Sequence, residues 1–187
     1  MKRTIFAVLV FALFCAFSLP AQSDNRAGVI LNHYSPRNFA TGTIPKADLE
    51  LIVQTGVRAP SASNRQPWHF TVVQNLELAK KIIPQTVEGN VLIIISTVGD
   101  GKTNTREIID CALATQSIYL AAQALGYSSR IYTSPIDAFN RNLRNETRLP
   151  RDHTAIAIVR IGRVETAVDA TSSASSRKDT SEVVTYR

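Results

Sequence analysis

Side chains that can form hydrogen bonds are concentrated between Arg58 and Phe70, a stretch that reads RAPSASNRQPWHF. It contains two prolines, the only tryptophan, and four small polar residues: Ser61, Ser63, Asn64 and Gln66. Proline fixes φ, lacks a backbone donor and biases the preceding residue toward extended geometry. We therefore expect a stiff loop that holds amide and hydroxyl groups in fixed directions, as a small-molecule site requires. The alternative, which the residues considered alone favour, is a capped turn between a helix and a strand.

A second polar group, His33-Tyr34-Ser35-Pro36-Arg37, has the chemistry of a phosphate site. A serine hydroxyl and a guanidinium close together in sequence can both donate to phosphate oxygens, and the guanidinium adds a fixed positive charge. Histidine also donates, but it carries a full charge only when protonated. The alternative is a turn at Ser35-Pro36 followed by a surface arginine, and the segment in isolation favours it.

Both stretches resemble the nitroreductase family. APSASNRQPW matches the family pattern A-P-S-x-x-N-x-Q-P-W, and Ser35 and Arg37 match R-x-S-x-R, with His33 at the first arginine. A third match, D-x-A-x-x-x-Q, runs from Asp110 to Gln116. The resemblance implies an FMN-dependent oxidoreductase with an α+β fold, whose mixed, mainly antiparallel central sheet of four to five strands is flanked by helices. It also implies an intertwined homodimer with an FMN in each of two sites at the subunit interface.

The resemblance further implies which residues contact FMN. The phosphate would be held by His33, Ser35, Arg37, Arg177 and Lys178. The ribityl chain and ring would be contacted by Arg58, Ser61, Asn64 and Gln66, with Thr133 and Ser134 close to the reactive N5. Many relatives have a glycine near these last two residues, and this chain has none between Tyr132 and Pro135.

The reaction implied by the resemblance is ping-pong hydride transfer. A reduced nicotinamide would reduce the flavin and be replaced by an electron-poor acceptor such as a nitroaromatic or a quinone. The flavin carries the redox chemistry, so no catalytic side chain is expected to stand out. The three histidines, His33, His69 and His153, lack metal-ligand spacing, so no metal is expected. Two alternatives remain: a reductase served by another electron donor, and a flavin-binding or structural dimer without efficient turnover.

Hydrophobic periodicity predicts the elements that position these residues. Strands are expected at residues 70–73, 91–96, 129–134 and 154–162, and helices at residues 26–32, 45–57, 76–83, 105–125 and 136–145. The helix at 105–125 is apolar around most of its circumference, yet Glu107 and Asp110 argue against a membrane span. We expect it to be buried between other layers, either as a monomeric core helix or, by the resemblance, across a dimer interface.

The chain has 187 residues, of which 44% are hydrophobic and 19% are charged, enough to bury the core of one domain. We assign residues 24–187 to a single nitroreductase-like FMN-binding domain. Four arginines lie near one face if their region is helical: Arg141, Arg144, Arg148 and Arg151. No aromatic residues are interleaved with them, so a solvated face is predicted rather than a nucleic-acid site.

Residues 1–23 have the features of a secretory signal peptide. Lys2 and Arg3 precede an apolar run from Ile5 to Leu19, which is short for a membrane span and ends in small residues. The alternative is an uncleaved anchor. We expect the mature protein to be exported, either periplasmic or secreted. Removing Lys2 and Arg3 lowers the formal net charge from +6 to +4. Cys111 is then the only cysteine, and its apolar helix predicts a buried, inert thiol.

The carboxyl-terminal part changes in composition. Residues 170–176 form a Ser/Thr-rich linker with no capacity to build a core, and Glu182–Tyr186 regains strand-like composition. The resemblance implies that residues 170–187 are a linker and an extension that embraces the partner subunit. The alternative is a frayed terminus.

Overall fold

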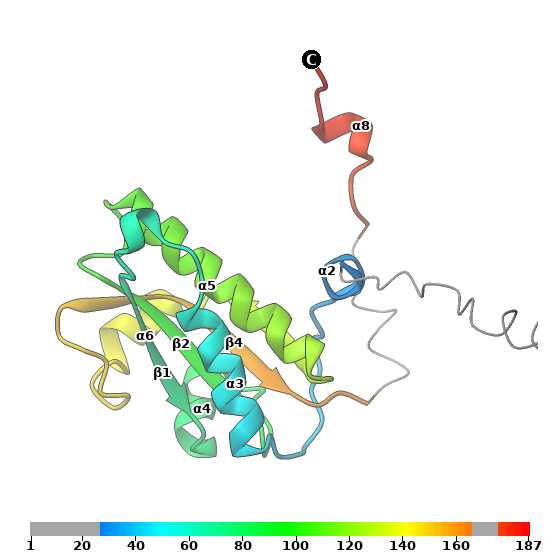
Figure 1. Cartoon of the computed structure of the whole chain (residues 1–187). Coiled ribbons are helices and arrows are strands. Elements are labelled where there is room, and N and C mark those ends of the chain that lie inside the picture. The colour runs from blue at the N-terminus through cyan, green and yellow to red at the C-terminus, as the bar shows by residue number, and fades with distance from the viewer. Residues whose placement is uncertain (1–26, 166–175) are drawn as a thin grey trace, which may run out of the picture. The chain divides into compact units, whose positions relative to one another are not determined.

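The computed structural model describes residues 27–165 and 176–187, and its centre is a four-stranded sheet whose neighbouring strands all run antiparallel (Figure 1). The strands are β1 (Trp68–Val73), β2 (Val91–Val98), β3 (Ser128–Tyr132) and β4 (His153–Gly162). Their order across the sheet is β1-β2-β4-β3. The predicted α+β class with a mainly antiparallel central sheet is confirmed.

The two central strands, β2 and β4, are buried on both faces. Successive side chains of a strand point to opposite faces. Ile93 and Ile95 therefore belong to one hydrophobic cluster, whereas Leu92 and Ile94 belong to a second cluster on the other side. This explains why β2 is apolar without alternation, as its sequence predicted.

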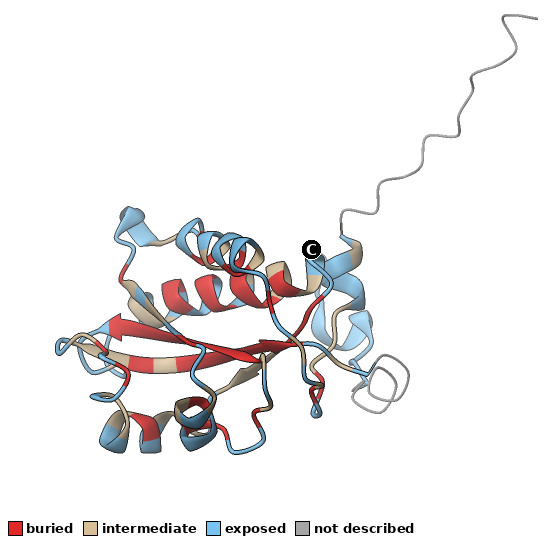
Figure 2. Cartoon of the chain, turned by 90° about the horizontal axis from the view of Figure 1, so that it is seen from below, coloured by how far each residue is buried: buried red, intermediate tan, exposed pale blue. Residues whose placement is uncertain are grey.

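Helices cover both faces of the sheet, so that buried strands lie between two helical layers (Figure 2). The helices α3 (Lys46–Val57) and α5 (Thr105–Ala124) pack on one face, and α4 (Leu76–Ile82) and α6 (Ile136–Asn142) pack on the other. Gly56 allows α3 to approach α5 closely, because a Cβ at this position would lie 2.7 Å from Cδ1 of Ile118. This contact fixes α5 beside the end of α3, where the loop after Arg58 begins.

Helix α5 is buried along one face only. Asp110, Ala114 and Ile118 are buried, but Ile109 is 53% exposed and Leu113 is 41% exposed. The prediction that other layers enclose this helix is wrong for the single chain, because its second apolar face is not covered by any part of residues 27–165. The periodicity had shown that both faces were apolar, but it could not show how many faces one chain covers.

Arg141, Arg144, Arg148 and Arg151 were expected to share a face only if their region is helical, and this condition is not met. Helix α6 ends at Asn142, so the four arginines do not share a helical surface. Arg144 instead donates from Nη2 to the carbonyl oxygens of Pro150, Arg151 and His153, at 3.1, 3.0 and 3.0 Å. Its charge thus stabilises the turn that leads into β4.

The carboxyl-terminal end is helical where strand-like composition had been noted. Residues Thr180–Val183 form a short helix, α8. Asp179 accepts a hydrogen bond from the backbone N of Ser181, and the Glu182 side chain accepts one from the backbone N of Asp179, which together form a capping box. This capping box favours a helical turn. A strand at residues 182–186 would need a neighbouring strand for its backbone hydrogen bonds, and none of the described strands pairs with these residues.

Several predicted segments lie outside the described residues, namely the signal peptide at 1–23 and most of the 170–176 linker. The short helix α2 (Gly28–Asn32) belongs to a compact unit that ends at Leu31, and the sheet belongs to the unit that begins at Asn32. Among the described residues, no helix has the length and apolar character needed to cross a membrane.

Candidate functional site

The loop from Arg58 to Pro67, which we call the signature loop, has a strained backbone. It contains a single 3-10 turn, η1 (Ala62–Asn64), and three non-glycine residues with positive φ: 54° at Ser63, 54° at Asn64 and 49° at Gln66. Asparagine tolerates this region, but at serine and glutamine the left-handed backbone costs roughly 1–2 kcal/mol per residue. Such strain persists only where surrounding contacts impose it, and it is concentrated at ligand sites.

Internal hydrogen bonds hold the polar groups of the signature loop together. Ser61 Oγ accepts from the backbone N of Gln66 at 3.1 Å, and Asn64 Oδ1 accepts from Gln66 Nε2 at 3.1 Å. Three of the predicted flavin-contacting residues therefore form one network. Asn64 and Gln66 are exposed, as is Arg58 at the carboxyl-terminal end of α3. The loop thus presents amide groups in fixed positions to its surroundings.

Asp110 attaches the signature loop to α5. Its Oδ1 accepts a hydrogen bond from the backbone N of Ala62 at 3.0 Å, although the residue is only 4% exposed. The other oxygen, Oδ2, is buried and has no hydrogen-bond partner among the residues that the structure describes. A buried carboxylate with an unused acceptor is costly unless a donor reaches it. The sequence had marked Asp110 by its position in the family pattern, and the structure shows its contact with the loop.

Replacing Asp110 by alanine is expected to release the signature loop. A hydrogen bond to a charged group contributes about 1.5–3 kcal/mol, so local opening of the loop should become roughly 10- to 100-fold more frequent. Trypsin cleavage after Arg58 or Arg65 measures this opening. Asp110→Asn, which keeps an acceptor at Oδ1, should be cleaved at an intermediate rate. Cleavage of the alanine variant at the parental rate would show that Asp110 does not hold the loop.

The segment His33–Arg37 lies against the second half of α5. The backbone N of Tyr34 donates to Gln123 Oε1 at 3.4 Å, and Gln123 Nε2 donates to the carbonyl oxygen of Tyr34 at 2.9 Å. Ser35 Oγ and the hydroxyl of Tyr119 share a hydrogen bond of 3.1 Å. The His33 ring stands edge-on to the ring of Tyr119, with centroids 5.5 Å apart. Three consecutive residues of the segment are therefore held by two side chains of α5.

Two arginines lie in or beside this segment. Arg37 is exposed, as a residue that binds a phosphate from solvent must be. Arg130, on β3, donates from Nη1 to the carbonyl oxygen of Pro36 at 3.0 Å, and its guanidinium lies 5.4 Å from the ring centroid of Tyr132. The segment thus carries positive charge from two different elements, although its first motif arginine is replaced by His33.

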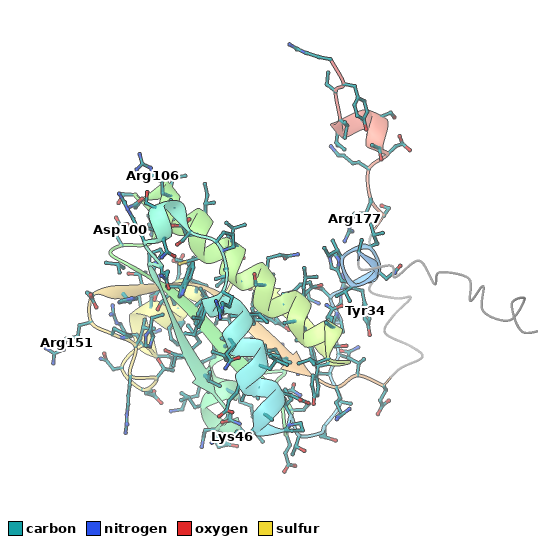
Figure 3. The ribbon with its side chains drawn as sticks, in the orientation of Figure 1. Tyr34, Lys46, Asp100, Arg106, Arg151 and Arg177 are labelled. Atoms are coloured by element: carbon teal, nitrogen blue, oxygen red, sulfur yellow. The ribbon has the colours of Figure 1, made fainter. Side chains whose placement is uncertain are left out.

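The signature loop and the segment are attached to opposite ends of α5. Figure 3 shows Arg106 near the amino-terminal end of the helix and Tyr34 near the other end. From Asp110, which holds the loop, to Gln123, which holds the segment, the helix advances 13 residues, or roughly 20 Å at 1.5 Å per residue. A single chain therefore does not bring the two groups together around one point.

Four further residues were predicted to contact the flavin: Thr133, Ser134, Arg177 and Lys178. Thr133 and Ser134 are exposed after the end of β3, where the carbonyl oxygen of Thr133 accepts from Ile136 N at the start of α6. Arg177 and Lys178 are exposed and follow residues 166–175, which lie outside the described residues. The roles assigned to these four residues stay predictions.

Two other titratable side chains that the structure describes, Cys111 and His69, have shifted pKa values. Burial raises the pKa of the Cys111 thiol to about 11, which fits the expected inert thiol. His69 is exposed on the edge strand β1, with its ring 5.7 Å from that of His153, and partial burial lowers its pKa. Within residues 27–165 and 176–187, no group of three or more histidine, cysteine or acidic residues could hold a metal ion.

The sequence did not identify three residues that position the segment: Tyr119, Gln123 and Arg130. Gln123 lies within the helix whose mostly apolar surface predicted burial. A glutamine one turn after a tyrosine on an otherwise apolar surface is a usable signal, because buried polar groups need partners. The identity of those partners, however, depends on the fold.

Known proteins share sequence with the part of the chain that contains the segment and the signature loop. The family model described as Nitroreductase family matches residues 30–91, which include both the segment and the signature loop. A protein of Archaeoglobus fulgidus named "Putative NADH dehydrogenase/NAD(P)H nitroreductase" is 31% identical over 143 residues, covering 72% of this chain and 82% of that protein. A protein of the same name from Methanothermobacter thermautotrophicus is 26% identical over 137 residues, covering 68% of this chain and 71% of that protein.

Solved structures share the fold. A nitroreductase with bound FMN from Desulfitobacterium hafniense superposes with a TM-score of 0.69 at 22% identity, covering 85% of this chain and 96% of that one. A nitroreductase with bound FMN from Bacteroides fragilis gives a TM-score of 0.69 at 23% identity, with the same coverage of both chains. The Archaeoglobus fulgidus relative, at 31% identity, shows that this chain belongs to the nitroreductase family, whose model also matches residues 30–91.

Proposed function

We propose that this protein binds FMN and is an oxidoreductase that transfers hydride from a reduced nicotinamide, or another donor, to an electron-poor acceptor such as a nitroaromatic or a quinone. Membership of the nitroreductase family supports an oxidoreductase. The structural observation that carries the proposal is the strained signature loop, whose three left-handed residues and exposed amides are held in place by Asp110. A turn that only connects a helix to a strand would not need this strain.

The residues present fit FMN. A flavin phosphate needs a cation and several donors, and the segment offers the exposed Arg37 guanidinium, the Ser35 hydroxyl and the His33 ring. The ring and ribityl chain need fixed donors and acceptors, which Asn64 and Gln66 provide in the signature loop. When bound, FMN supplies the hydride chemistry, and the protein's part is to bind it and orient it.

We further propose a homodimer, because α5 has an exposed stripe centred on Gln116. The stripe consists of Ile109 and Leu113 before Gln116 and the half-buried Leu120 after it, spaced to lie on one helical face. An exposed apolar face of this kind is typical of a surface that is covered in an assembly. A second copy of the chain is the expected cover, since most homo-oligomers are two-fold dimers.

The proposed dimer also explains why the two polar groups are far apart on one chain. A two-fold axis at Gln116 would pair the two α5 helices antiparallel, so that Gln123 of one copy lies opposite residue 109 of the other. The segment held by Gln123 would then meet the signature loop of the second copy, which is attached at Asp110. Each of two sites would be built from both copies.

The cofactor is tested by purifying the mature protein and recording its absorbance, because bound oxidised flavin is yellow. We expect FMN to be released on denaturation and identified by its mass, since the segment supplies a terminal phosphate site. Recovering FAD, or finding no flavin uptake after incubation with excess FMN, would contradict the proposal.

A flavin-binding dimer without efficient turnover is the second candidate. It is favoured by His33 in place of the usual arginine and by the absence of glycine between Tyr132 and Pro135. Mixing the FMN-loaded protein with NADH or NADPH without oxygen separates the two candidates. Rapid loss of the yellow colour, restored by a quinone or a nitroaromatic, supports the enzyme. No loss of colour with either nicotinamide, in a protein whose bound flavin dithionite still bleaches, would support the second candidate.

Export of the mature chain is also part of the proposal. It rests on residues 1–23, and it matters because an exported enzyme meets little reduced nicotinamide. Cell fractionation followed by amino-terminal sequencing tests it. A mature protein that begins near Asp24 would support export, whereas recovery of the whole chain from the cytosol would contradict it.

A further inference from the structure

Gln123 pairs with both backbone groups of one residue in the segment. Its Oε1 accepts from the N of Tyr34 and its Nε2 donates to the carbonyl oxygen of the same residue. A strand neighbour would offer the same two groups, but residues 33–39 lie in neither a helix nor a strand. The Gln123 amide therefore replaces a neighbouring strand as the hydrogen-bond partner of Tyr34, and it fixes the direction of the backbone at this residue.

The Gln123 amide is itself held in one orientation. Its Nε2 also donates to Ser129 Oγ at 3.1 Å, and Ser129, which is fully buried, donates to the carbonyl oxygen of Tyr119 at 2.7 Å. Both hydrogens of the amide nitrogen are used, so a flipped amide would place its nitrogen against the N–H of Tyr34 and its oxygen against two acceptors. β3 and α5 thus fix Gln123 before any ligand arrives.

Tyr119, one turn earlier on α5, contacts the residues on either side of Tyr34 in the segment. Its hydroxyl shares a hydrogen bond with Ser35 Oγ, and its ring packs against His33. Tyr119 and Gln123 together set the positions of three residues, and Arg37 follows two residues later. Preorganisation of this kind lowers the ordering cost of binding.

We propose that Gln123 is a positioning residue for phosphate binding, with Tyr119 as its partner: it orders the segment so that the Ser35 hydroxyl and the Arg37 guanidinium are directed at one phosphate. The inference rests on the proposed function. The inference predicts that Gln123 increases the affinity for a ligand that carries a phosphate and does not change the affinity for the same ligand without the phosphate.

The test compares FMN with riboflavin, which has the same ring and ribityl chain but no phosphate. Gln123→Met keeps the length of the side chain and removes both hydrogen bonds to Tyr34, while Tyr119→Phe keeps the ring and removes the contact with Ser35. We expect each variant to raise the Kd for FMN by roughly 10- to 100-fold and to change the Kd for riboflavin by less than about twofold. Gln74→Met, at an exposed glutamine after β1, is the control and should change neither.

Hydrogen exchange in the flavin-free protein gives a readout that does not depend on the cofactor. Backbone amides of residues 33–37 should exchange about tenfold faster in Gln123→Met than in the parent, at an unchanged melting temperature. Unchanged exchange, or an equal loss of affinity for FMN and riboflavin, would overturn the inference. If the parent binds neither flavin, the proposed function fails, and the exchange measurement still decides whether Gln123 orders the segment.

Discussion

Replacing Arg37 by alanine is expected to weaken FMN binding roughly 30- to 150-fold. A phosphate dianion needs a fixed positive charge, and His33 supplies one only when it is protonated. Arg37 should therefore carry more of the binding than one arginine does in a site with two. Losing a charge-assisted hydrogen bond costs on the order of 2–3 kcal/mol, which gives the stated range. Quenching of flavin fluorescence during a titration measures the dissociation constant directly.

Arg151→Ala is the matched control, since Arg151 is an exposed arginine in the turn before β4 and should have no effect. If Arg37→Ala binds FMN as tightly as the parent at every pH, the phosphate is bound elsewhere and the role assigned to the segment is wrong.

Replacing His33 by arginine adds a fixed positive charge to the segment and is expected to tighten FMN binding. An arginine carries a fixed charge and donates through a planar fork that fits a phosphate, whereas a histidine is charged only when it is protonated. Since a hydrogen bond to a charged group contributes about 1.5–3 kcal/mol, His33→Arg should lower the Kd for FMN by roughly tenfold or more. Fluorescence-quenching titrations compare the two proteins. An unchanged Kd would show that the side chain at position 33 does not reach the phosphate.

Leu113→Arg should convert the protein from a dimer to a monomer and abolish most FMN binding. Leu113 is 41% exposed and lies one turn from Gln116, where we place the two-fold axis. In the dimer the substitution would bury two unpaired guanidinium groups, which costs several kcal/mol. The dimer dissociation constant should rise at least about 100-fold. Light scattering measures the mass, and the loss of FMN should follow the loss of the dimer at each protein concentration.

Val72→Arg is the matched control for this experiment, because Val72 has a similar exposure, 38%, but lies on β1. It should leave both the mass and the flavin content unchanged. A Leu113→Arg protein that stays dimeric and retains FMN would place the interface on another surface and contradict the proposed two-copy site.

The sequence determined the elements because their signals are local. The apolar run of β2 predicted a central strand buried on both faces. The long helix was predicted to begin at the observed residue, Thr105, and to end one residue after the observed end, Ala124. Both depend only on side-chain period and on the nearest neighbours. The same holds for the signature loop, whose prolines and small polar residues predicted an irregular backbone, which the positive φ values bear out.

The tertiary structure decided which chemical groups meet. Ala62 and Asp110 are 48 residues apart in sequence, and Tyr34 and Gln123 are 89 apart, yet each pair forms a hydrogen bond. A local sequence pattern does not identify such a pair, because the two residues come together only when α5 packs on the sheet. The sequence did not predict that Leu113 is exposed for the same reason. An apolar residue gives the same sequence signal whether it is buried by its own chain or by a second chain. Local propensity therefore specified the helices, the strands and the polar groups, and packing alone decided that the two groups lie at opposite ends of one helix.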